Sequence, residues 1–474
     1  MKTSLRILFC LLVLSLGGCL PEERFWWSPD GTRAVVAIDS QLHLVTPGGE
    51  VGVPLSDQLK VEGDLPRHVS WLPDGRGFLL YRTIKRRNWE EVRVLLPDEE
   101  TKEIERRAMG MPGLLSAGLA SSGDRNLAES VMALVSDHEK ELWSAAYFCA
   151  FARQKEAIES ILRGSLKGAE FLAEVNEAAV ECQIHEICLV KLRGDQMDGE
   201  PVSLVRSIRP VLLPVVSPKF PAFAYWRVLD QEKRGELEVC SLDGLSRISV
   251  ASTTNTTVGW TSDGRSLIFA APVAEDGALF QNIRKVTVVE ESGALAQKFE
   301  PANLAAAIMT DPPRLCVLPD DRVLFSSLPV TLPAPSDGLN LDPRLYVISA
   351  DGKSVTAVPT AAGDLPTNLS FFTASPDGKR VAVVESDTDA VAVVEISTGK
   401  TEIVSPAHPN WHCRTMPAWK SAHELTFAAL DRPEGKPGWM LWSQGKGVRA
   451  ISEKWPAEAT TRWLEKKDPP KNNP

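Results

Sequence analysis

A short phrase built around Pro-Asp-Gly recurs along most of the chain and limits its fold more than any other feature. Good copies are Trp27-Ser-Pro-Asp-Gly31, Trp71-Leu-Pro-Asp-Gly75, Trp260-Thr-Ser-Asp-Gly264, Val317-Leu-Pro-Asp-Asp321 and Ala374-Ser-Pro-Asp-Gly378. Each copy leads into an apolar run, as in Arg33-Ala-Val-Val-Ala37. Pro fixes φ, Asp caps the turn and Gly takes the positive φ that a reversal needs. Each copy therefore predicts a tight turn between two strands.

The spacing of these turns gives the size of a repeating unit. Asp30 and Asp74 are 44 residues apart, and Asp263, Asp320 and Asp377 follow one another at intervals of 57. A second hairpin follows the first in each unit, so each unit supplies four short strands. Units of roughly 40 to 45 residues with four strands are typical of propeller blades.

The phrase W-S-P-D-G, followed by an apolar run and then L-Y-V-[IV]-x-x-D-G, resembles the repeat of TolB-type β-propellers. Similar repeats occur in the propeller domains of prolyl-oligopeptidase and dipeptidyl-peptidase-type enzymes. The resemblance implies an all-β fold with a single propeller over residues 19–465, and Trp27, Trp71 and Trp260 at equivalent blade positions. We expect eight four-stranded blades, with seven as the alternative. The motif builds blades rather than sites and implies little about function.

One interruption of the repeat predicts a helical insertion. Pro73 and Pro218 are 145 residues apart, which exceeds two blade periods by 57 residues. Apolar residues in the interval 127–182 recur every three or four positions, which is typical of helices. We expect these helices to project from a third blade whose outer hairpin comprises residues 186–190 and 201–204.

Large apolar side chains concentrate in one part of this insertion, namely Trp143, Tyr147, Phe148 and Phe151. A lone helical hairpin cannot bury so many on one face, and an uncovered patch of that size is unusual on a monomer. They therefore cover either the propeller flank or a partner. The first alternative makes the insertion a structural decoration, and the second makes it a docking element.

The first 18 residues have the pattern of a secretory signal peptide, with Lys2 and Arg6 before an apolar run that is too short to span a bilayer. Leu16-Gly17-Gly18-Cys19 resembles the bacterial lipobox. That resemblance implies that Cys19 becomes the lipidated N-terminus of a membrane-anchored lipoprotein. In the family rule, Leu20 in place of Asp after the cysteine favours the outer membrane of the cell envelope. Residues 466–474 are expected to form a disordered tail.

Charge and cysteine content fit an exported protein. Without Lys2 and Arg6, the 52 basic residues become 50 against 62 acidic ones, and this net charge of about −12 argues against nucleic-acid binding. Of the cysteines after Cys19, Cys149 and Cys182 are the best candidates for a disulfide across neighbouring helices. We expect the others to be buried free thiols.

The search for catalytic and metal-binding groups predicts no catalytic residue, no cofactor and no metal. The sequence has no Gly-x-Ser-x-Gly nucleophile motif. A ring of turn aspartates (Asp30, Asp74, Asp263, Asp320 and Asp377) is explained by backbone capping. His408, His412, Cys413 and His423 cluster in one region, but the intervening Pro favours loop histidines with ordinary hydrogen bonds. Asp387 and Asp389 lack the Gly and Glu of a calcium loop.

These observations favour a non-catalytic, lipid-anchored propeller that binds a protein or glycan partner at the cell envelope. The alternative is a propeller enzyme, of polysaccharide lyase or hydrolase type, with its site in the central channel. A structural subunit of an envelope complex is a third interpretation. Clustered His, Arg and acidic side chains at the channel mouth would favour the enzyme.

Overall fold

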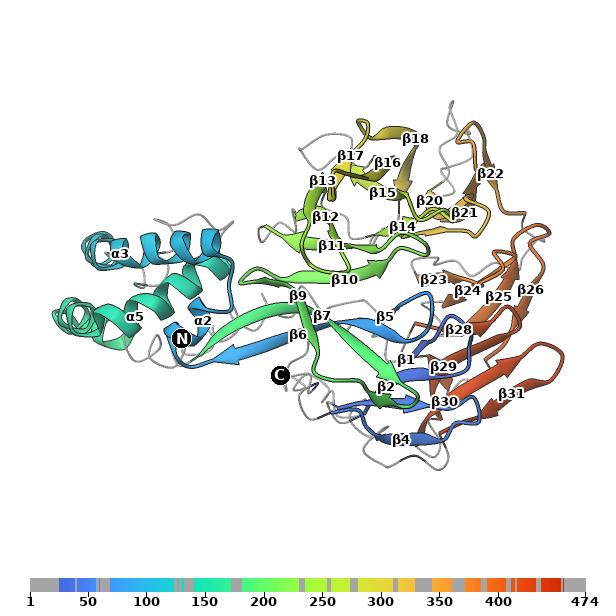
Figure 1. The fold of residues 1–474 in the computed structure, drawn as a ribbon, viewed down its shortest axis with the longest axis horizontal. Coiled ribbons are helices and arrows are strands. Elements are labelled where there is room, and N and C mark those ends of the chain that lie inside the picture. The colour runs from blue at the N-terminus through green and yellow to red at the C-terminus, as the bar shows by residue number, and fades with distance from the viewer. Residues whose placement is uncertain are drawn as a thin grey trace, which may run out of the picture.

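The computed structural model describes residues 25–38, 41–56, 59, 69–122, 127, 130–131, 140–171, 181–229, 235–253, 257–272, 280–309, 314–328, 343–359, 371–384, 390–405, 411–413, 416–431, 436–452 and 455. These residues form a mainly-β propeller of antiparallel strands with a helical insertion at one side (Figure 1). The expected signal peptide, Cys19 and the tail 466–474 lie outside the described residues.

The described strands form six sheets, five of which have four or five strands and are separate blades. The first blade contains β1 (Phe25–Trp27), β2 (Ala34–Ile38), β3 (Gln41–Val45) and β4 (Val51–Pro54). The second contains β5 (Val69–Trp71), β6 (Gly77–Arg86), β7 (Cys182–Arg193), β8 (Gln196–Met197) and β9 (Val202–Ser207). The third contains β10 (Val211–Val216), β11 (Ala222–Val228), β12 (Gly235–Ser241) and β13 (Arg247–Thr253).

The last two of these five blades lie toward the C-terminus. One contains β23 (Phe371–Ala374), β24 (Arg380–Val384), β25 (Val391–Glu395) and β26 (Thr401–Ile403). The other contains β27 (Trp411–Cys413), β28 (Ala418–Ser421), β29 (Glu424–Asp431), β30 (Lys436–Ser443) and β31 (Gly447–Ala450).

The sixth sheet has nine strands and lies between the third blade and the last two in the sequence. Its first half contains β14 (Val258–Trp260), β15 (Ser266–Pro272), β16 (Gln281–Glu291), β17 (Ala294–Gln297) and β18 (Ala302–Met309). Its second half contains β19 (Leu315–Val317), β20 (Val323–Leu328), β21 (Arg344–Ile348) and β22 (Val355–Ala357). The halves are joined where β18 pairs with β20 through two residue pairs, Ile308 with Leu328 and Met309 with Ser327.

The core lies between neighbouring sheets, because each sheet is covered on both faces. Every residue of β2 is buried, which explains why its sequence is a continuous apolar run rather than an alternating one. Trp26 and Trp71 belong to one apolar cluster between the first and second blades. Strand β4 at the outer edge is mostly exposed.

Tryptophan side chains tie first strands of adjacent blades together. The indole Nε1 of Trp71 donates to the carbonyl oxygen of Trp26 at 2.9 Å, and Trp260 donates in the same way to Val215 at 2.9 Å. Trp419 repeats the bond with Thr373 at 3.0 Å. The expected equivalence of the repeat tryptophans is confirmed for Trp71 and Trp260. Each lies in the first strand of its sheet and donates to the first strand of the preceding blade.

The ring closes by side-chain packing between the first and last blades. Phe25 and Trp27 share an apolar cluster with Trp439 and Trp455. The Trp455 indole donates to the carbonyl oxygen of Gly49 at 2.6 Å. Strands β1 to β4 form the first blade and β27 to β31 form the last, so the two blades share no described strand. The segment 460–463, which resembles a further opening strand, lies outside the described residues.

The expectation that residues 186–190 and 201–204 belong to a separate third blade was wrong. These residues form β7 and β9 of the second blade, where β7 pairs with β6 from Gly77–Lys191 through Arg86–Cys182. The insertion therefore splits one blade between its second and third strands. The count of repeat periods failed because it assumed that every blade is continuous in the sequence.

The insertion is also larger than the expected range 127–182. It contains α2 (Trp89–Arg93), α3 (Asp98–Ser121) and α5 (Lys140–Arg163), and Cys182 already belongs to β7. In Figure 1, α3 and α5 lie side by side beyond the ends of β6, β7 and β9, away from the ring. Helix α3 was missed because Pro112, flanked by glycines, indicates a break rather than a helix interior.

The large apolar residues of α5 pack into a core that belongs to the insertion itself. Phe148 and Phe151 are buried there, and Trp143 and Tyr147 pack against the same cluster. Ile184 from β7 belongs to the same core, which thereby continues onto the base of the second blade. Helix α3, absent from the sequence expectation, supplies much of the covering surface. The four side chains therefore pack mainly inside the insertion, and the expectation that they must cover the propeller flank or a partner was wrong.

Candidate functional site

A charged cavity of about 190 Å³ lies where the insertion meets the second and third blades. Its walls come from the start of α3, from α5, from β9 and its connection to β10, and from β11 and β13. The lining residues are Pro97, Glu99, Glu100, Glu103, Leu142, Arg206, Ser207, Arg209, Arg227 and Arg247. Four arginines in so small a space make this the candidate functional site, which we call the arginine cavity.

A buried glutamate holds the arginines of the second blade in place. Glu186 is completely buried, and its two carboxylate oxygens accept from Arg82 Nε at 2.6 Å and from Arg206 Nε at 2.7 Å. Burial raises the pKa of Glu186, but the two guanidinium groups outweigh it and leave the pKa below its usual value. Glu186 is therefore ionised and fixes the direction of the Arg206 guanidinium.

The third blade repeats this arrangement with Glu238, which is also buried. Its carboxylate accepts from Arg227 Nε at 2.8 Å and from the hydroxyl of Tyr225, and Arg247 Nε lies 3.7 Å away. Arg227 also pairs with Glu236 at 2.6 Å. These residues sit on adjacent antiparallel strands, where opposite side chains are close enough to pair. Two blades thus direct arginines into the same cavity.

Glu100, in the first turn of α3, attaches the insertion to the propeller. Its carboxylate accepts from the Ser207 hydroxyl at 2.8 Å and from the backbone N–H of Ile208 at 3.2 Å. Burial raises the pKa of Glu100, although these hydrogen bonds and nearby arginines act in the opposite direction. One wall of the arginine cavity is therefore tied to the other by a single acidic side chain.

Arg209 differs from the other cavity arginines. Its Nε is buried and has no hydrogen-bond partner among the described residues. A buried polar atom without a partner is costly, and more so on a charged group. Such an atom in a native structure calls for an explanation, and a bound molecule is one of the usual ones.

Sequence reasoning predicted none of these residues. Arg206 and Arg209 flank Ser207-Ile208, and Arg227 and Arg247 lie on strands of the third blade, so they come from two separate blades. The only local signal is alternation of Glu and Arg with apolar residues along β7, β11 and β12, which alone indicates ordinary cross-strand pairs.

The repeat aspartates for which the structure gives side-chain bonds serve as turn caps, as expected. In the first blade, Asp30 accepts from the Ser28 hydroxyl at 2.6 Å and from the Thr32 N–H at 3.1 Å, and these bonds lower its pKa. Asp263 with Thr261 and Asp377 with Ser375 repeat the hydroxyl bond at 2.6 Å. Asp74 caps the Arg76 N–H at 2.9 Å, and Asp320 binds Arg322 at 2.7 Å.

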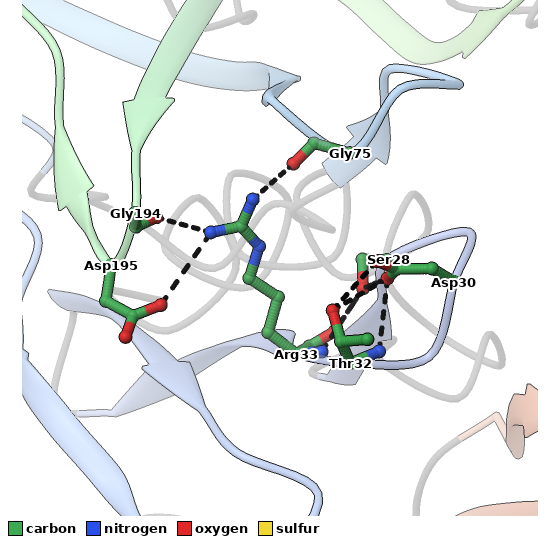
Figure 2. A network of polar contacts seen from close by, with 7 residues as sticks. All are labelled: Ser28, Asp30, Thr32, Arg33, Gly75, Gly194 and Asp195. Atoms are coloured by element: carbon green, nitrogen blue, oxygen red, sulfur yellow. Dashed lines mark hydrogen bonds and ion pairs between the residues drawn. The ribbon is translucent and has the colours of Figure 1, made fainter.

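The first turn also connects two blades. Figure 2 shows the Arg33 guanidinium extending from the first blade to the carbonyl oxygens of Gly75 and Gly194 in the second. The bond to Gly75 is 2.6 Å long, and the carboxylate of Asp195 lies 3.7 Å away. This polar network joins the first and second blades.

The residues considered for a metal site are only partly described. His423 Nδ1 lies 2.8 Å from the Gln444 side-chain oxygen, an ordinary hydrogen bond of the kind expected. His408 and the side chains of His412 and Cys413, like Asp387 and Asp389, lie outside the described residues. The described part of the chain contains no group of His, Cys, Asp or Glu arranged to hold a metal ion.

The proposed disulfide partners lie in one apolar core but are not bonded. Cys149 and Cys182 are both buried in the insertion core, and both are free thiols. Burial raises the pKa of Cys149 to about 11 and that of Cys182 to about 12. Cys188 and Cys240 are buried free thiols, as expected, whereas Cys316 is a free thiol that is only half-buried. Among the described helices, none is long and apolar enough to cross a bilayer.

Comparisons with known proteins give distant structural similarity to TolB-type and other β-propellers. TolB from Acinetobacter baumannii is 20% identical over 56% of this chain and 58% of its own, with a TM-score of 0.36. The chain thus spans 58% of the length of that TolB. The Cps50 (Swd1) β-propeller domain from Myceliophteria thermophila is 10% identical over 90% of this chain and 97% of its own, with a TM-score of 0.44. No family model and no curated protein matches the sequence.

Proposed function

We propose that this chain is a non-catalytic lipoprotein of the bacterial cell envelope, whose propeller is a binding or scaffold module for a protein or glycan partner. The observation that supports it best is the arginine cavity at the junction between insertion and propeller. Small-molecule and side-chain recognition sites are typically concave, with a few polar groups that converge on one point.

The buried ion pairs around the cavity support a role in recognition. Glu186 and Glu238 are both almost inaccessible, and burying charge is expensive even when the charges are paired. Replacing such pairs by apolar residues is often neutral or stabilising, so they are poor devices for stability alone. Arginine recognises planar anionic groups through its rigid fork of donors. Fixing Arg206 and Arg227 in advance reduces the entropic cost of binding.

The membrane anchor in this proposal is the lipid on Cys19. Each buried CH₂ contributes about 0.8 kcal/mol, so the acyl chains of a lipoprotein N-terminus hold a protein firmly on a bilayer. Strand β1 begins at Phe25, six residues after Cys19, so the propeller stays close to the lipid surface. Leu20 after the cysteine favours the outer membrane.

We infer in addition that the ring has seven blades. The two halves of the nine-stranded sheet contribute Ile268 and Phe325 to one apolar cluster, as two stacked blades would. Counting each half as a blade adds two to the five separate ones. The eighth blade expected from the repeat spacing is not needed, because its residues belong to the second blade.

The anchor is tested by a Cys19→Ser variant expressed in a bacterial host supplied with a palmitate analogue. Cys10→Ser, within the signal peptide, is the matched control. We expect the Cys19 variant to lose the label and move to the soluble fraction, and the control to keep both label and membrane location. A labelled, membrane-bound Cys19→Ser protein would contradict the lipoprotein assignment. In a second test, intact envelopes containing the wild-type protein are cross-linked before the protein is purified. We expect a partner to be recovered bound to it.

A further inference from the structure

We propose that the arginine cavity binds one small oxyanion, a carboxylate or phosphate group presented by the partner, with Arg209 as the principal donor. The inference rests on the proposed function in treating the cavity as the recognition site. It adds the chemical class of the ligand and the residue that selects it.

The donor groups of the cavity are arranged for an anion. Arg206 donates its Nε–H to Glu186, and Arg227 donates its Nε–H to Glu238. Arg209 differs, because its buried Nε has no hydrogen-bond partner among the described residues. A guanidinium presents five N–H donors in a fixed fork that matches a carboxylate or phosphate. An oxyanion in the cavity would pair with the Arg209 guanidinium, which lines the cavity and, unlike those of Arg206 and Arg227, is not held by Glu186 or Glu238.

The acidic residues of the lining are largely occupied elsewhere. Glu103 binds Arg106 and Arg107 at 2.7 Å each, and these bonds lower its pKa to about 2. Both oxygens of Glu100 accept hydrogen bonds, one from Ser207 at the end of β9 and one from the N–H of Ile208 just after it. Glu99 is exposed and reaches the solvent. The acceptors already present therefore leave the Arg209 Nε unpaired.

Helix α3 begins at the wall of the cavity. Its first turn, with Pro97, Glu99 and Glu100, lines the cavity, and the helix has 24 residues. No side chain caps this N-terminus. The positive end of a helix dipole favours an anion placed at its first turn, and Asp98, Glu99 and Glu100 already supply carboxylates there.

The size of the cavity suits a single small group rather than a chain. Its volume is about 190 Å³, and a cavity of roughly 150 Å³ is enough for a benzene ring. A carboxylate or phosphate group is smaller than that ring, so it fits with one or two waters. A long acidic segment would have to remain outside, with only one anionic group inserted.

The experiment titrates the purified, detergent-solubilised full-length protein with inorganic phosphate and, separately, with acetate, at constant ionic strength. Isothermal calorimetry should show saturable single-site binding of at least one of them, and the anion that binds identifies the group carried by the partner. Arg209→Gln should raise the dissociation constant about ten-fold or more, because it removes a charged hydrogen bond to the anion. Arg193→Gln changes an exposed arginine at the end of β7; it is the matched control and should bind like wild type.

Two results would overturn the inference: no saturable binding of either anion to wild type, or equal binding by Arg209→Gln and wild type. If Arg209→Gln does not unfold cooperatively, Arg209→Lys is used in its place. Lysine keeps the positive charge but lacks the planar set of guanidinium donors, so we expect the same weakening of anion binding. If the wild-type protein binds neither anion but still captures a partner on envelopes, only this inference is refuted. Anion binding without any envelope partner would instead refute the proposed function.

Discussion

The indole Nε1 of Trp27 donates a hydrogen bond to the Thr426 hydroxyl at 3.0 Å, although 399 residues separate them. Thr426 in turn donates to the carbonyl oxygen of Ala418. Gly31, in the turn after Trp27, has a φ of +66° and lies so close to the Lys420 carbonyl that no side chain fits there. The first and last blades are therefore fitted to each other at the inner strands, where a propeller would otherwise open.

The Trp27–Thr426 bond should contribute measurably to stability. Trp27→Phe keeps the aromatic ring and removes the donor, and Thr426→Val removes the acceptor. We expect each to lower the free energy of unfolding by about 1 kcal/mol, and the double variant to lose less than the sum. Urea denaturation of the four proteins gives the coupling energy. Fully additive losses would show that the two groups do not interact.

Gln154 compensates for the proline inside α3. Pro112 has no N–H to donate to the carbonyl oxygen of Ala108 one turn earlier, and the Gln154 side chain donates there instead at 3.0 Å. Gln154 itself lies at a kink in α5, with φ −131° and ψ 26°. The two helix irregularities therefore meet at one hydrogen bond.

Gln154→Ala should destabilise the insertion by about 1 kcal/mol, because it leaves the Ala108 carbonyl without a partner. In a Pro112→Ala background the backbone N–H is restored, and the same change should cost much less. Hydrogen exchange of the insertion amides reports the effect locally. An equal cost in both backgrounds would mean that Gln154 does not serve the proline.

His185 should make the second blade sensitive to acid. It is buried, its Nδ1 lies 2.7 Å from the Tyr81 hydroxyl, and burial lowers its pKa from 6.5 to about 4. A histidine with a depressed folded pKa stabilises the fold above pH 6.5 and loses that contribution as pH falls toward 4. Between pH 7.5 and 5, this amounts to about 2 kcal/mol.

The test is the free energy of unfolding of wild type and His185→Gln at both pH values. Glutamine does not titrate and retains an acceptor for Tyr81. We expect wild type to lose about 2 kcal/mol more than the variant on acidification. Equal losses would place the acid sensitivity in other groups.

The insertion should be dispensable for the ring. Strands β6 and β7 pair as far as Arg86 and Cys182, so a short Gly/Ser turn in place of residues 88–181 completes a hairpin. Each blade is stabilised chiefly by its neighbours. Ile184 is also changed to Thr, so that removing the helices does not expose this apolar side chain at the base of the blade. We expect this variant to be a monomer that unfolds cooperatively and has a weaker helical signal in circular dichroism. Aggregation of this variant would show that the helices support the ring.

The sequence specifies those parts of the fold that depend on neighbouring residues. Each Pro-Asp-Gly phrase contains its whole hairpin, so the turn at Asp30 and the strand that follows it could be predicted directly. The pairing of Arg86 with Cys182 bridges a long insertion, and periodicity within a short window contains no information about it. Pro112 likewise reads as a helix break, because its compensation by Gln154 comes from another helix.

The arginine cavity could not be predicted for a related reason. Glu186 and Arg206 form an ordinary cross-strand pair on β7 and β9, and such pairs are common on antiparallel sheets. What makes them unusual is their burial and their convergence with Arg209 and Arg227. Convergence of that kind depends on how two blades and the insertion meet.

The most direct test of the central claim, partner binding at the junction of insertion and propeller, is site-specific photo-cross-linking on intact cells. A photoreactive residue at Glu99, an exposed lining position of the arginine cavity, should form a discrete adduct with an envelope partner. The same residue at Lys353, whose side chain is 83% exposed on the nine-stranded sheet, should not. No adduct from Glu99, or the same adduct from both positions, would contradict the account.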